Sequence, residues 1–291
     1  MKIGQFSNFM LIDTHAHLNL SAFDKDRDFI IKKCLKNNIR MINVGTNYET
    51  SRKAVEIAQK YQEGVFAAIG LHPINLDTGL VKIKKDLLES TSNFCEREFD
   101  YEKYERLAQS SKVVAIGEIG LDYYWKPKTT KKKELFKKFQ KDLLTKQLKL
   151  ANEFNLPIIF HCRMAHAELS ELLKSNIKNI KSKLRGVMHG FVGTLEELKS
   201  SLKLGLYIGF NGIIFKKIEG IDFKKVIFET PLQKILIETD CPYLTPPTFP
   251  EKRNNPLAVK YILKEISEIK KISQEDLEKV INENARNLFN L

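Results

Sequence analysis

Short apolar runs typical of buried β-strands alternate along the chain with amphipathic stretches of helical spacing. Helical spacing is clearest in residues 51–61 and 131–150. In the second stretch, Leu135, Phe139 and Leu143 recur at every fourth residue and predict one buried helix face. Apolar strands need helices over their outer side, so eight of them predict a parallel sheet closed into a (β/α)8 TIM barrel. The predicted strands are residues 9–13, 39–45, 65–70, 113–118, 157–161, 186–189, 206–210 and 234–238.

An open, doubly wound sheet is the structural alternative. Such a sheet binds its ligand after a glycine-rich first turn, whereas residues 13–17 read Asp-Thr-His-Ala-His. No internal repeat or linker marks a second domain, so residues 1–291 are expected to form a single domain. The longest irregular stretch is 74–112. It is expected to be an enlarged βα loop on the catalytic face, with a helix near 81–90 and an acidic, aromatic patch near 96–105.

Composition narrows the class of protein. Hydrophobic residues make up 43% of the 291, with 18 Phe and 9 Tyr, which supports a large core and excludes disorder. The chain has no apolar run of about 18 residues and no signal-peptide pattern, so no membrane association is expected. A cytoplasmic protein is expected, or a nuclear one if the source is eukaryotic. Four cysteines without a C-x-x-C pair exclude a disulfide scaffold. Nothing indicates an obligate protein partner, and a monomer is expected.

The chain is basic, with 48 Lys and Arg against 36 Asp and Glu and a net charge of +12. This excess favours a polyanionic partner such as nucleic acid. Because 39 of the bases are Lys, a simple role in solubility stays open. The segment 126–149 holds ten lysines and two acids, and it is either a solvated helix face or a nucleic-acid contact.

Four of the six histidines stand at or just beyond the carboxyl ends of predicted strands. His15 and His17 are two residues apart in an extended segment, so their side chains point to the same face. Two imidazole metal ligands require such a shared face, although these pairs also occur on solvated strands. The other two are His161 and His189, at the fifth and sixth strands.

Two carboxylates join these histidines at the same end of the predicted barrel. Glu118 ends the run 113–118, and Asp240 closely follows the run 234–238. An acid at the end of an apolar strand is costly to bury unless it is paired or metal-bound, although Asp240 could instead cap the turn before Pro242. Four imidazoles and two carboxylates exceed the ligands of one tetrahedral ion, which favours two adjacent divalent cations. Zinc, iron, manganese and magnesium all stay open.

Two further side chains are candidates for binding substrate. Arg163 follows His161 by two residues, and its planar guanidinium matches phosphate oxygens. His72 follows the third strand, where it could contact substrate or stabilise a turn.

Short polar motifs recur in order at the strand ends and near the carboxyl terminus. They are residues 12–18 (IDTHAHL), 70–73 (GLHP), 115–123 (AIGEIGLDY), 160–163 (FHCR), 188–191 (MHGF), 237–242 (IETDCP), 253–256 (RNNP) and 284–289 (NARNLF). With these motifs in this order, the chain resembles the TatD family of metal-dependent deoxyribonucleases, within the amidohydrolase-like barrels. The resemblance covers almost the whole chain, although the connection between strands three and four looks longer than is usual for the family.

The resemblance implies an enzyme that hydrolyses phosphodiester bonds of DNA with two divalent cations (Mg, Mn or Zn), as an exonuclease on single-stranded ends. One cation would be held by His15, His17 and Asp240. The other would be held by His161 and His189.

In the mechanism that this implies, Glu118 bridges the two cations and Asp240 accepts a proton from the attacking water. Arginines would hold the phosphate oxygens as negative charge accumulates. The residues expected to bind or position substrate are Arg163, Arg253, Asn254, His72 and Asp122, with Glu238 as a further positioning group.

Two other functions stay open. A related barrel could hydrolyse an amide, a lactone or a phosphoester. Many such enzymes, however, bridge their metals with a carbamylated lysine at the fourth strand, where this chain has Glu118. The other alternative is a nucleic-acid-binding protein with a vestigial metal site, and the intact set of ligands argues against it.

Overall fold

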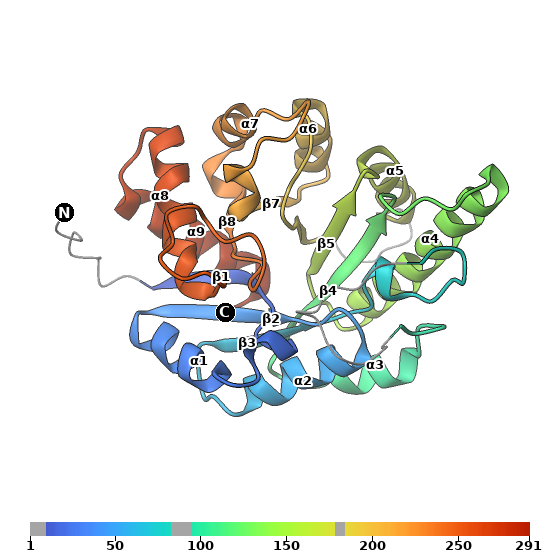
Figure 1. Cartoon of the computed structure of the whole chain (residues 1–291), viewed down its shortest axis with the longest axis horizontal. Coiled ribbons are helices and arrows are strands. Elements are labelled where there is room, and N and C mark those ends of the chain that lie inside the picture. The colour runs from blue at the N-terminus through green and yellow to red at the C-terminus, as the bar shows by residue number, and fades with distance from the viewer. Residues whose placement is uncertain (1–9, 83–94, 178–183) are drawn as a thin grey trace.

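The computed structural model describes residues 10–82, 95–177 and 184–291. Within them, eight parallel strands form one sheet in the order of the chain, and helices surround its outer face (Figure 1). This is the predicted (β/α)8 barrel. The strands are β1 (Leu11–Ala16), β2 (Ile39–Val44), β3 (Val65–Ile69), β4 (Val113–Asp122), β5 (Ile158–Arg163), β6 (Gly186–Met188), β7 (Tyr207–Phe210) and β8 (Ile235–Ile237).

Most helices follow strands in the alternation that the sequence predicts. None of the described helices has the length and apolar composition of a membrane span. The α-helices are α1 (Arg27–Lys36), α2 (Tyr48–Gln59), α3 (Tyr101–Ala108), α4 (Thr130–Glu153), α5 (His166–Ile177), α6 (Leu195–Lys203), α7 (Phe223–Glu229), α8 (Val259–Lys270) and α9 (Gln274–Phe289).

Side chains, rather than a full ladder of backbone bonds, close the barrel between β8 and β1. At this seam, backbone pairing in the described chain joins β1 only to the segment that follows β8, where a bridge links Ala16 to Cys241 and the carbonyl oxygen of His15 accepts the N–H of Asp240 at 2.8 Å. The buried Asp13 carboxyl group is hydrogen-bonded to the Thr239 hydroxyl at 2.5 Å and accepts the Thr239 N–H at 2.9 Å. Burial raises the pKa of Asp13 to about 8. These bonds fix the seam beside the predicted ligands.

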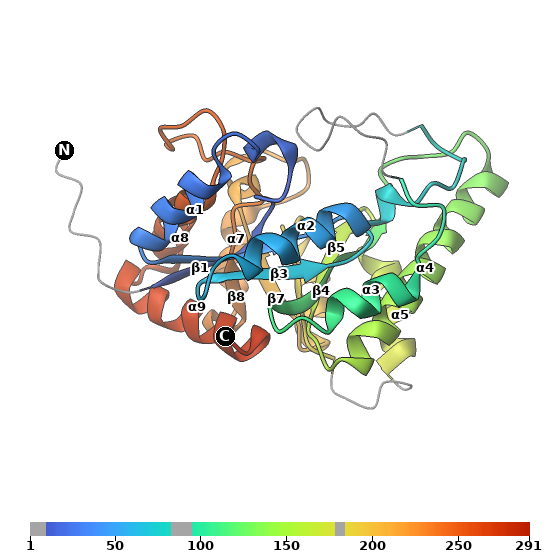
Figure 2. The same ribbon diagram turned by 90° about the horizontal axis from the view of Figure 1, so that it is seen from below.

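The helix α9 covers the amino-terminal end of the barrel. Figure 2 shows it beneath β1 and β8. Its residues Ala285, Leu288 and Phe289 pack with the side chains that fill the barrel interior. The Asn284 side chain donates to the carbonyl oxygens of Leu232 and Ile235 at 2.8 and 2.9 Å. The amino-terminal end of the barrel is therefore closed, and the carboxyl-terminal end is open.

The helix α4 buries a different face from the predicted one. Leu143 is buried, but Leu135 and Phe139 are 40% and 36% exposed, so the prediction was wrong for those two. A step of four residues advances about 40° around a helix, so a row of three drifts away from any one face.

Two glutamines occupy the buried stripe of α4 instead. Gln140 accepts the N–H of Asp122 at 2.8 Å and donates to its carbonyl oxygen at 2.9 Å. Gln147 does the same for Leu71, at 2.7 and 3.0 Å. Each glutamine satisfies a buried peptide group near the carboxyl end of a strand, which an apolar side chain could not do.

The described part of the long connection between β3 and β4 differs from the prediction. It contains α3, which the sequence analysis missed. The Glu96 carboxylate accepts hydrogen bonds from the Tyr48 N–H at 2.6 Å and the Tyr104 hydroxyl at 2.8 Å, so the patch near 96–105 fastens α3 to α2. The helix predicted near 81–90 lies, from residue 83 on, outside the described residues.

We predict that Phe289→Ala lowers the free energy of unfolding by about 3–5 kcal/mol, because it leaves a void at the closed end of the barrel. Phe289 is 2% exposed. Urea unfolding measures the change. The control is Phe228→Ala, at a site that is 56% exposed, where a loss below about 1 kcal/mol is expected. Equal losses in the two variants would contradict the assignment of α9 as a closing helix.

Candidate metal centre

Three donor atoms from the ends of β1 and β8 meet at the open mouth of the barrel. The Nε2 atoms of His15 and His17 lie 3.0 Å apart. Oδ1 of Asp240 lies 3.3 Å from Nε2 of His17 and 3.8 Å from Nε2 of His15. Two ligands that are each about 2.1 Å from one ion, at 90–110°, lie about 3.0–3.4 Å apart. The first two separations lie in this range, and the third corresponds to an angle of about 130° at the ion, so the three atoms are close enough to share a cation.

Hydrogen bonding decides which nitrogen of His17 faces this point. Its Nδ1 lies 2.8 Å from the carbonyl oxygen of Val44, which can only accept, so Nδ1 carries a proton. In the neutral ring the lone pair then lies on Nε2, directed toward His15. This is the tautomer that a metal-binding histidine needs.

Glu118 projects from β4 between two groups of histidines. Its Oε2 lies 3.4 Å from Nε2 of His15 and 3.9 Å from Nε2 of His17. Its Oε1 lies 2.7 Å from Nδ1 of His161 and 3.7 Å from Nε2 of His189. One oxygen thus faces each group, as a bridging carboxylate would.

His161 lies between two carboxylates, because its Nε2 is also 3.1 Å from Oδ2 of Asp122. The close approach of β4 and β5 requires glycine at position 120, where φ is +156° and a Cβ would lie 1.9 Å from the carbonyl oxygen of His161. Asp122, expected near the substrate, contacts the His161 ring.

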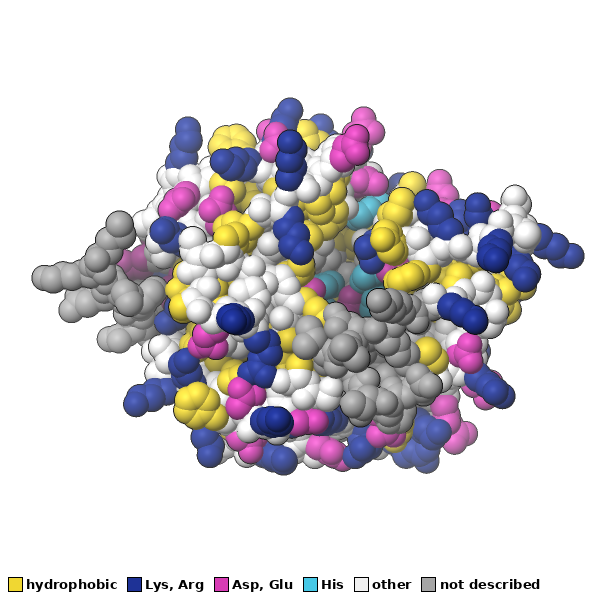
Figure 3. Space-filling model, in the orientation of Figure 1, with side chains coloured by type: hydrophobic (Ala, Val, Ile, Leu, Met, Phe, Trp, Pro, Cys, Tyr) yellow, Lys and Arg dark blue, Asp and Glu magenta, His cyan; other side chains and the backbone are white. Residues whose placement is uncertain are grey.

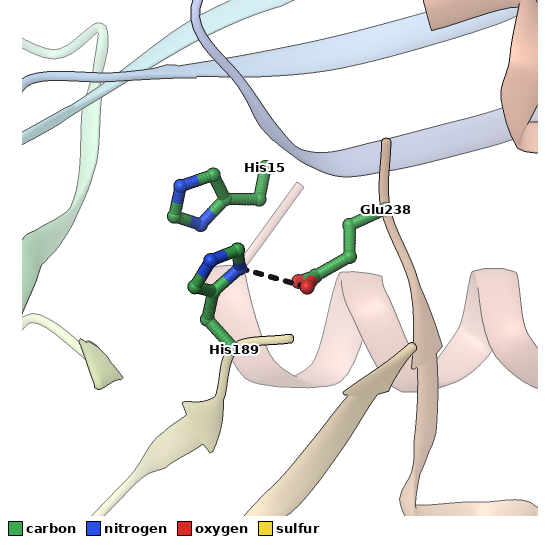
Figure 4. A group of neighbouring side chains, drawn as sticks. All are labelled: His15, His189 and Glu238. Atoms are coloured by element: carbon green, nitrogen blue, oxygen red, sulfur yellow. Dashed lines mark ion pairs between the residues drawn. The ribbon is translucent and has the colours of Figure 1, made fainter. Parts of the chain in front are cut away.

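His189 follows β6 and stacks on His15, with ring centroids 3.6 Å apart. Its Nδ1 lies 2.7 Å from Oε1 of the fully buried Glu238, as Figure 4 shows. The N–H of Gly190 donates to the same oxygen at 2.6 Å. This leaves Nε2 of His189 toward the centre, 3.9 Å from Oδ2 of Asp240. A carboxylate behind a ligand histidine fixes the ring and strengthens it as a base. The sequence signal for Glu238 was its two-residue spacing from Asp240.

The charges of the centre shift the pKa values of its members. Burial lowers the pKa of His161, but hydrogen bonds to Asp122 and Glu118 outweigh it and raise the pKa to about 9. Burial also lowers the pKa of His189, but the charge of Glu238 and other carboxylates raises it to about 10. Burial raises the pKa of Glu118, yet the surrounding histidines hold it well below its usual value. Near neutral pH the two rings are therefore protonated and the carboxylate is ionised.

The centre opens into a cavity of about 150 Å³. Figure 3 shows histidine side chains in this hollow, with Lys and Arg side chains on the surrounding surface. The cavity has room for a phosphate-sized group. Its walls include residues that the sequence analysis did not select, namely Leu20, Thr46, Ile74, Asn75 and Tyr243. Their only sequence signal is a position beyond the end of a strand.

His72 lines the cavity as expected for a substrate contact. Its Nδ1 accepts the N–H of Ile74 at 3.1 Å, so the neutral ring carries its proton on Nε2. That Nε2 lies 3.5 Å from Oε1 of Glu118. A ring held in this way donates a hydrogen bond and does not offer a lone pair to a cation.

Three other residues expected to bind substrate lie away from the cavity or have local partners. The Arg163 guanidinium stacks on the Tyr124 ring, 3.6 Å from its centroid. Arg253 pairs with Asp26 at 2.5 Å. The buried Asn254 side chain donates to two backbone carbonyl oxygens at 3.0 and 2.5 Å. None of the three is among the described residues that line the cavity.

A parallel barrel with buried imidazoles and carboxylates converging at its carboxyl-terminal mouth defines a metal-dependent hydrolase. Residues 12–290 match the family model described as TatD related DNase. The chain belongs to this family.

Individual relatives cover nearly the whole chain. It is 36% identical over 284 residues to the uncharacterized metal-dependent hydrolase YabD of Bacillus subtilis, covering 97% of this chain and 100% of YabD. It is 31% identical over 284 residues to the 3'-5' ssDNA/RNA exonuclease TatD of Cronobacter sakazakii, covering 96% and 97% of the two chains. The TatD homolog YJJV from Escherichia coli has a similar crystal structure, with a TM-score of 0.77 and 28% identity, covering 97% and 98%.

We predict that metal affinity rises with pH. A divalent cation that binds His161 and His189 must displace their protons, because their pKa values are about 9 and 10. Below these values, each displaced proton makes the affinity about tenfold stronger per pH unit. Calorimetric titration of manganese between about pH 6 and 8, in buffers of different ionisation enthalpy, measures affinity and proton release together. An affinity independent of pH, without proton release, would contradict the prediction.

Glu238→Gln is expected to weaken metal binding by about 10–100-fold, because the ring of His189 loses the charge behind it. The matched control is Glu197→Gln, since Glu197 lies 3.6 Å from Nδ1 of His166 in a similar pair outside the centre. Calorimetric titration with the metal measures the affinity of both variants. If the two behave alike, Glu238 does not act through His189.

Proposed function

We propose that the protein hydrolyses phosphodiester bonds of single-stranded nucleic acid, DNA foremost, and removes nucleotides from the 3′ end. The observation that carries the proposal is the position of Glu118, whose two oxygens face two groups of histidine nitrogens. Two adjacent cations that act on one phosphate need such a bridge. The relatives named 3'-5' ssDNA/RNA exonuclease support the substrate and the direction.

The donor set suits two divalent cations. In the proposal, the β1 histidines and Asp240 would hold one cation, His161 and His189 would hold the other, and Glu118, which faces both groups, would be a ligand common to the two. Imidazole and carboxylate ligands are compatible with zinc and manganese, and a phosphate substrate would complete the oxygen ligands of magnesium. When bound, these ions supply Lewis acidity and lower the pKa of water.

Asp240 is placed to accept the proton of the attacking water. It lines the cavity, and its side chain is 17% exposed, compared with 6% for Glu118. Burial raises the pKa of Asp240, but the neighbouring His189 and His17 outweigh it and hold it below the usual value. The carboxylate is therefore ionised at neutral pH, and its exposed part can pass the proton to solvent.

His72 is placed to donate a hydrogen bond to a phosphate oxygen. It lines the cavity, and its proton is held on Nε2 by the bond that Nδ1 accepts from Ile74. Negative charge accumulates on these oxygens in the transition state, where a preorganised donor stabilises it.

The mouth of the barrel favours a flexible, anionic substrate. The net charge of +12 attracts a polyanion. A cavity of about 150 Å³ admits the phosphate of a bendable strand end. A base-paired end would first have to unpair, at a cost of a few kcal/mol, before one strand could enter. No lysine is among the described residues that line the cavity, so the carbamylated bridge of many amidohydrolases has no counterpart there.

Digestion of oligonucleotides tests the proposal. We expect a 3′-labelled single strand to release labelled mononucleotide at once, and a 5′-labelled strand to give a descending ladder. Activity should require magnesium, manganese or zinc added back after chelation, and a blunt duplex should be cut much more slowly. Hydrolysis of small amides or lactones without hydrolysis of oligonucleotides would overturn the proposal.

Glu118→Gln keeps the shape of the side chain and removes its charge. We expect kcat on single-stranded DNA to fall by about 10³-fold, since several kcal/mol of transition-state stabilisation depend on the cations. The fold should be retained, as checked by circular dichroism. The control Glu49→Gln changes a surface acid paired with Arg52 and should leave kcat unchanged. Near-normal turnover in Glu118→Gln would remove the bridging role.

A further inference from the structure

A second hollow, of about 330 Å³, is lined by Tyr123, the residue that follows Asp122 of the metal centre. It is formed by the segment after β4, the end of β5 and the beginning of α4 and α5. Five of the residues that line it are aromatic or apolar, and three lysines and Glu168 line it as well; the five are Tyr123, Trp125, Pro127, Phe136 and Met164. None of its described lining residues belongs to the metal cavity. On this face of the molecule, Figure 3 shows hydrophobic side chains directly next to the histidines.

Flat side chains are concentrated at this place. Trp125 is the single tryptophan of the chain and is half-buried. It contacts Tyr124 edge to face, with centroids 5.4 Å apart, and Tyr124 is 49% exposed. The guanidinium of Arg163 stacks on the Tyr124 ring at 3.6 Å. The Trp125 ring lines the hollow, and the Tyr124–Arg163 stack adjoins it, with the Trp125 and Tyr124 rings at 89° to each other. We call these three side chains the platform. It offers the Trp125 face, of the kind on which unpaired bases stack, and the Tyr124–Arg163 stack supports Trp125 from the side.

The platform is tied to the metal centre through Asp122. Oδ2 of Asp122 lies 3.1 Å from Nε2 of His161, and its Oδ1 accepts the N–H of Tyr124 at 2.9 Å. The N–H of Tyr123 donates to the carbonyl oxygen of Arg163 at 2.9 Å. The ends of β4 and β5 therefore hold the platform in a fixed position relative to the cations' ligands.

The charge around the hollow is positive. Lys137 and Lys141 both pair with Glu168, at 2.7 and 2.5 Å, so one of these two charges is balanced. The ammonium groups of Lys126 and Lys133 form no ion pair with any residue that the structure describes. The segment from 126 to 133 contains five lysines and no acid. A polyanionic strand passing over an aromatic platform fits this distribution, whereas an acidic or neutral peptide would leave the rings without a flat partner.

We propose that this hollow binds an unpaired base of the strand whose phosphate enters the metal cavity. Trp125 is the stacking partner, the Tyr124–Arg163 pair holds the Trp125 ring in place, and Lys126 and Lys133 are phosphate contacts. The proposal rests on the proposed function, because it names a base-binding site for that substrate. It also predicts that base pairing excludes binding, since a paired base does not offer its face.

The single tryptophan allows a direct test without hydrolysis. Magnesium-loaded protein is titrated with a phosphorothioate oligo(dT), which resists cleavage, and with an abasic oligomer of the same length. We expect oligo(dT) to quench Trp125 fluorescence and to bind about tenfold more tightly than the abasic strand. A duplex should leave the fluorescence unchanged. Equal binding and no difference in quenching between the two single strands would overturn the proposal.

Variants distinguish the contribution of the aromatic side chains from that of the lysines. Measured by anisotropy of a labelled oligo(dT), Trp125→Ala and Tyr124→Ala should each weaken binding by about tenfold, and Trp125→Phe by less than about threefold. The double variant Lys126→Gln and Lys133→Gln should lower the slope of log K against log salt by about 1.4. The matched controls are Phe228→Ala and the double variant Lys224→Gln and Lys225→Gln, all at exposed positions on α7. They should bind like the wild type, and weakening equal to that of the platform variants would overturn the proposal.

The outcomes distinguish this inference from the proposed function. Quenching by oligo(dT) without any hydrolysis of natural DNA would support the hollow and overturn the proposed function. Hydrolysis of natural DNA, with equal binding and equal quenching by oligo(dT) and the abasic strand, would support the proposed function and overturn the base-binding role of the hollow. If anionic phosphatidylglycerol vesicles, and not oligo(dT), change the Trp125 emission, the hollow serves a lipid surface and the proposal fails.

Discussion

The whole site depends on the hydrogen bonds at the seam of the barrel, where the segment that follows β8 meets β1. The buried Asp13 carboxyl group is bonded to the hydroxyl and the N–H of Thr239. In the backbone, the carbonyl oxygen of His15 accepts the N–H of Asp240 at 2.8 Å, and that of Cys241 accepts the N–H of His17 at 2.9 Å. These bonds set the separation of metal-ligand candidates that come from opposite ends of the sequence.

Each of three candidate ligand histidines is oriented by a hydrogen bond or ion pair to a group outside the ligand set. His17 is fixed by a backbone carbonyl oxygen, His161 by Asp122 and His189 by Glu238. Such a layer orients each ring before a cation arrives, which reduces the ordering needed on binding. Asp122 also holds the backbone of Tyr124, so the same carboxylate links the chemistry to the proposed base platform.

Sequence patterns predicted the barrel and the composition of the centre because both follow simple rules. Strand alternation places His15 and His17 on one face, and parallel strands bring their carboxyl ends together. Those rules do not predict which polar side chain forms hydrogen bonds with the backbone at the end of a given strand. Buried Gln140 was therefore missed, while Leu135 and Phe139 were assigned to the core although they face outward. The roles of Arg163 and Arg253 depend on neighbours such as Tyr124 and Asp26, which no local spacing reveals.

The position of α9 has a consequence for how the protein is made. Its apolar face completes the interior at the opposite end from the cations' ligands, and it is contributed by residues Gln274–Phe289, which leave the ribosome after all eight strands. Until then, the nascent sheet exposes the bottom of its interior to water and to other chains. Shortened products that lack α9 should accordingly be targets for chaperones and proteases, even though every ligand of the centre is already present in them.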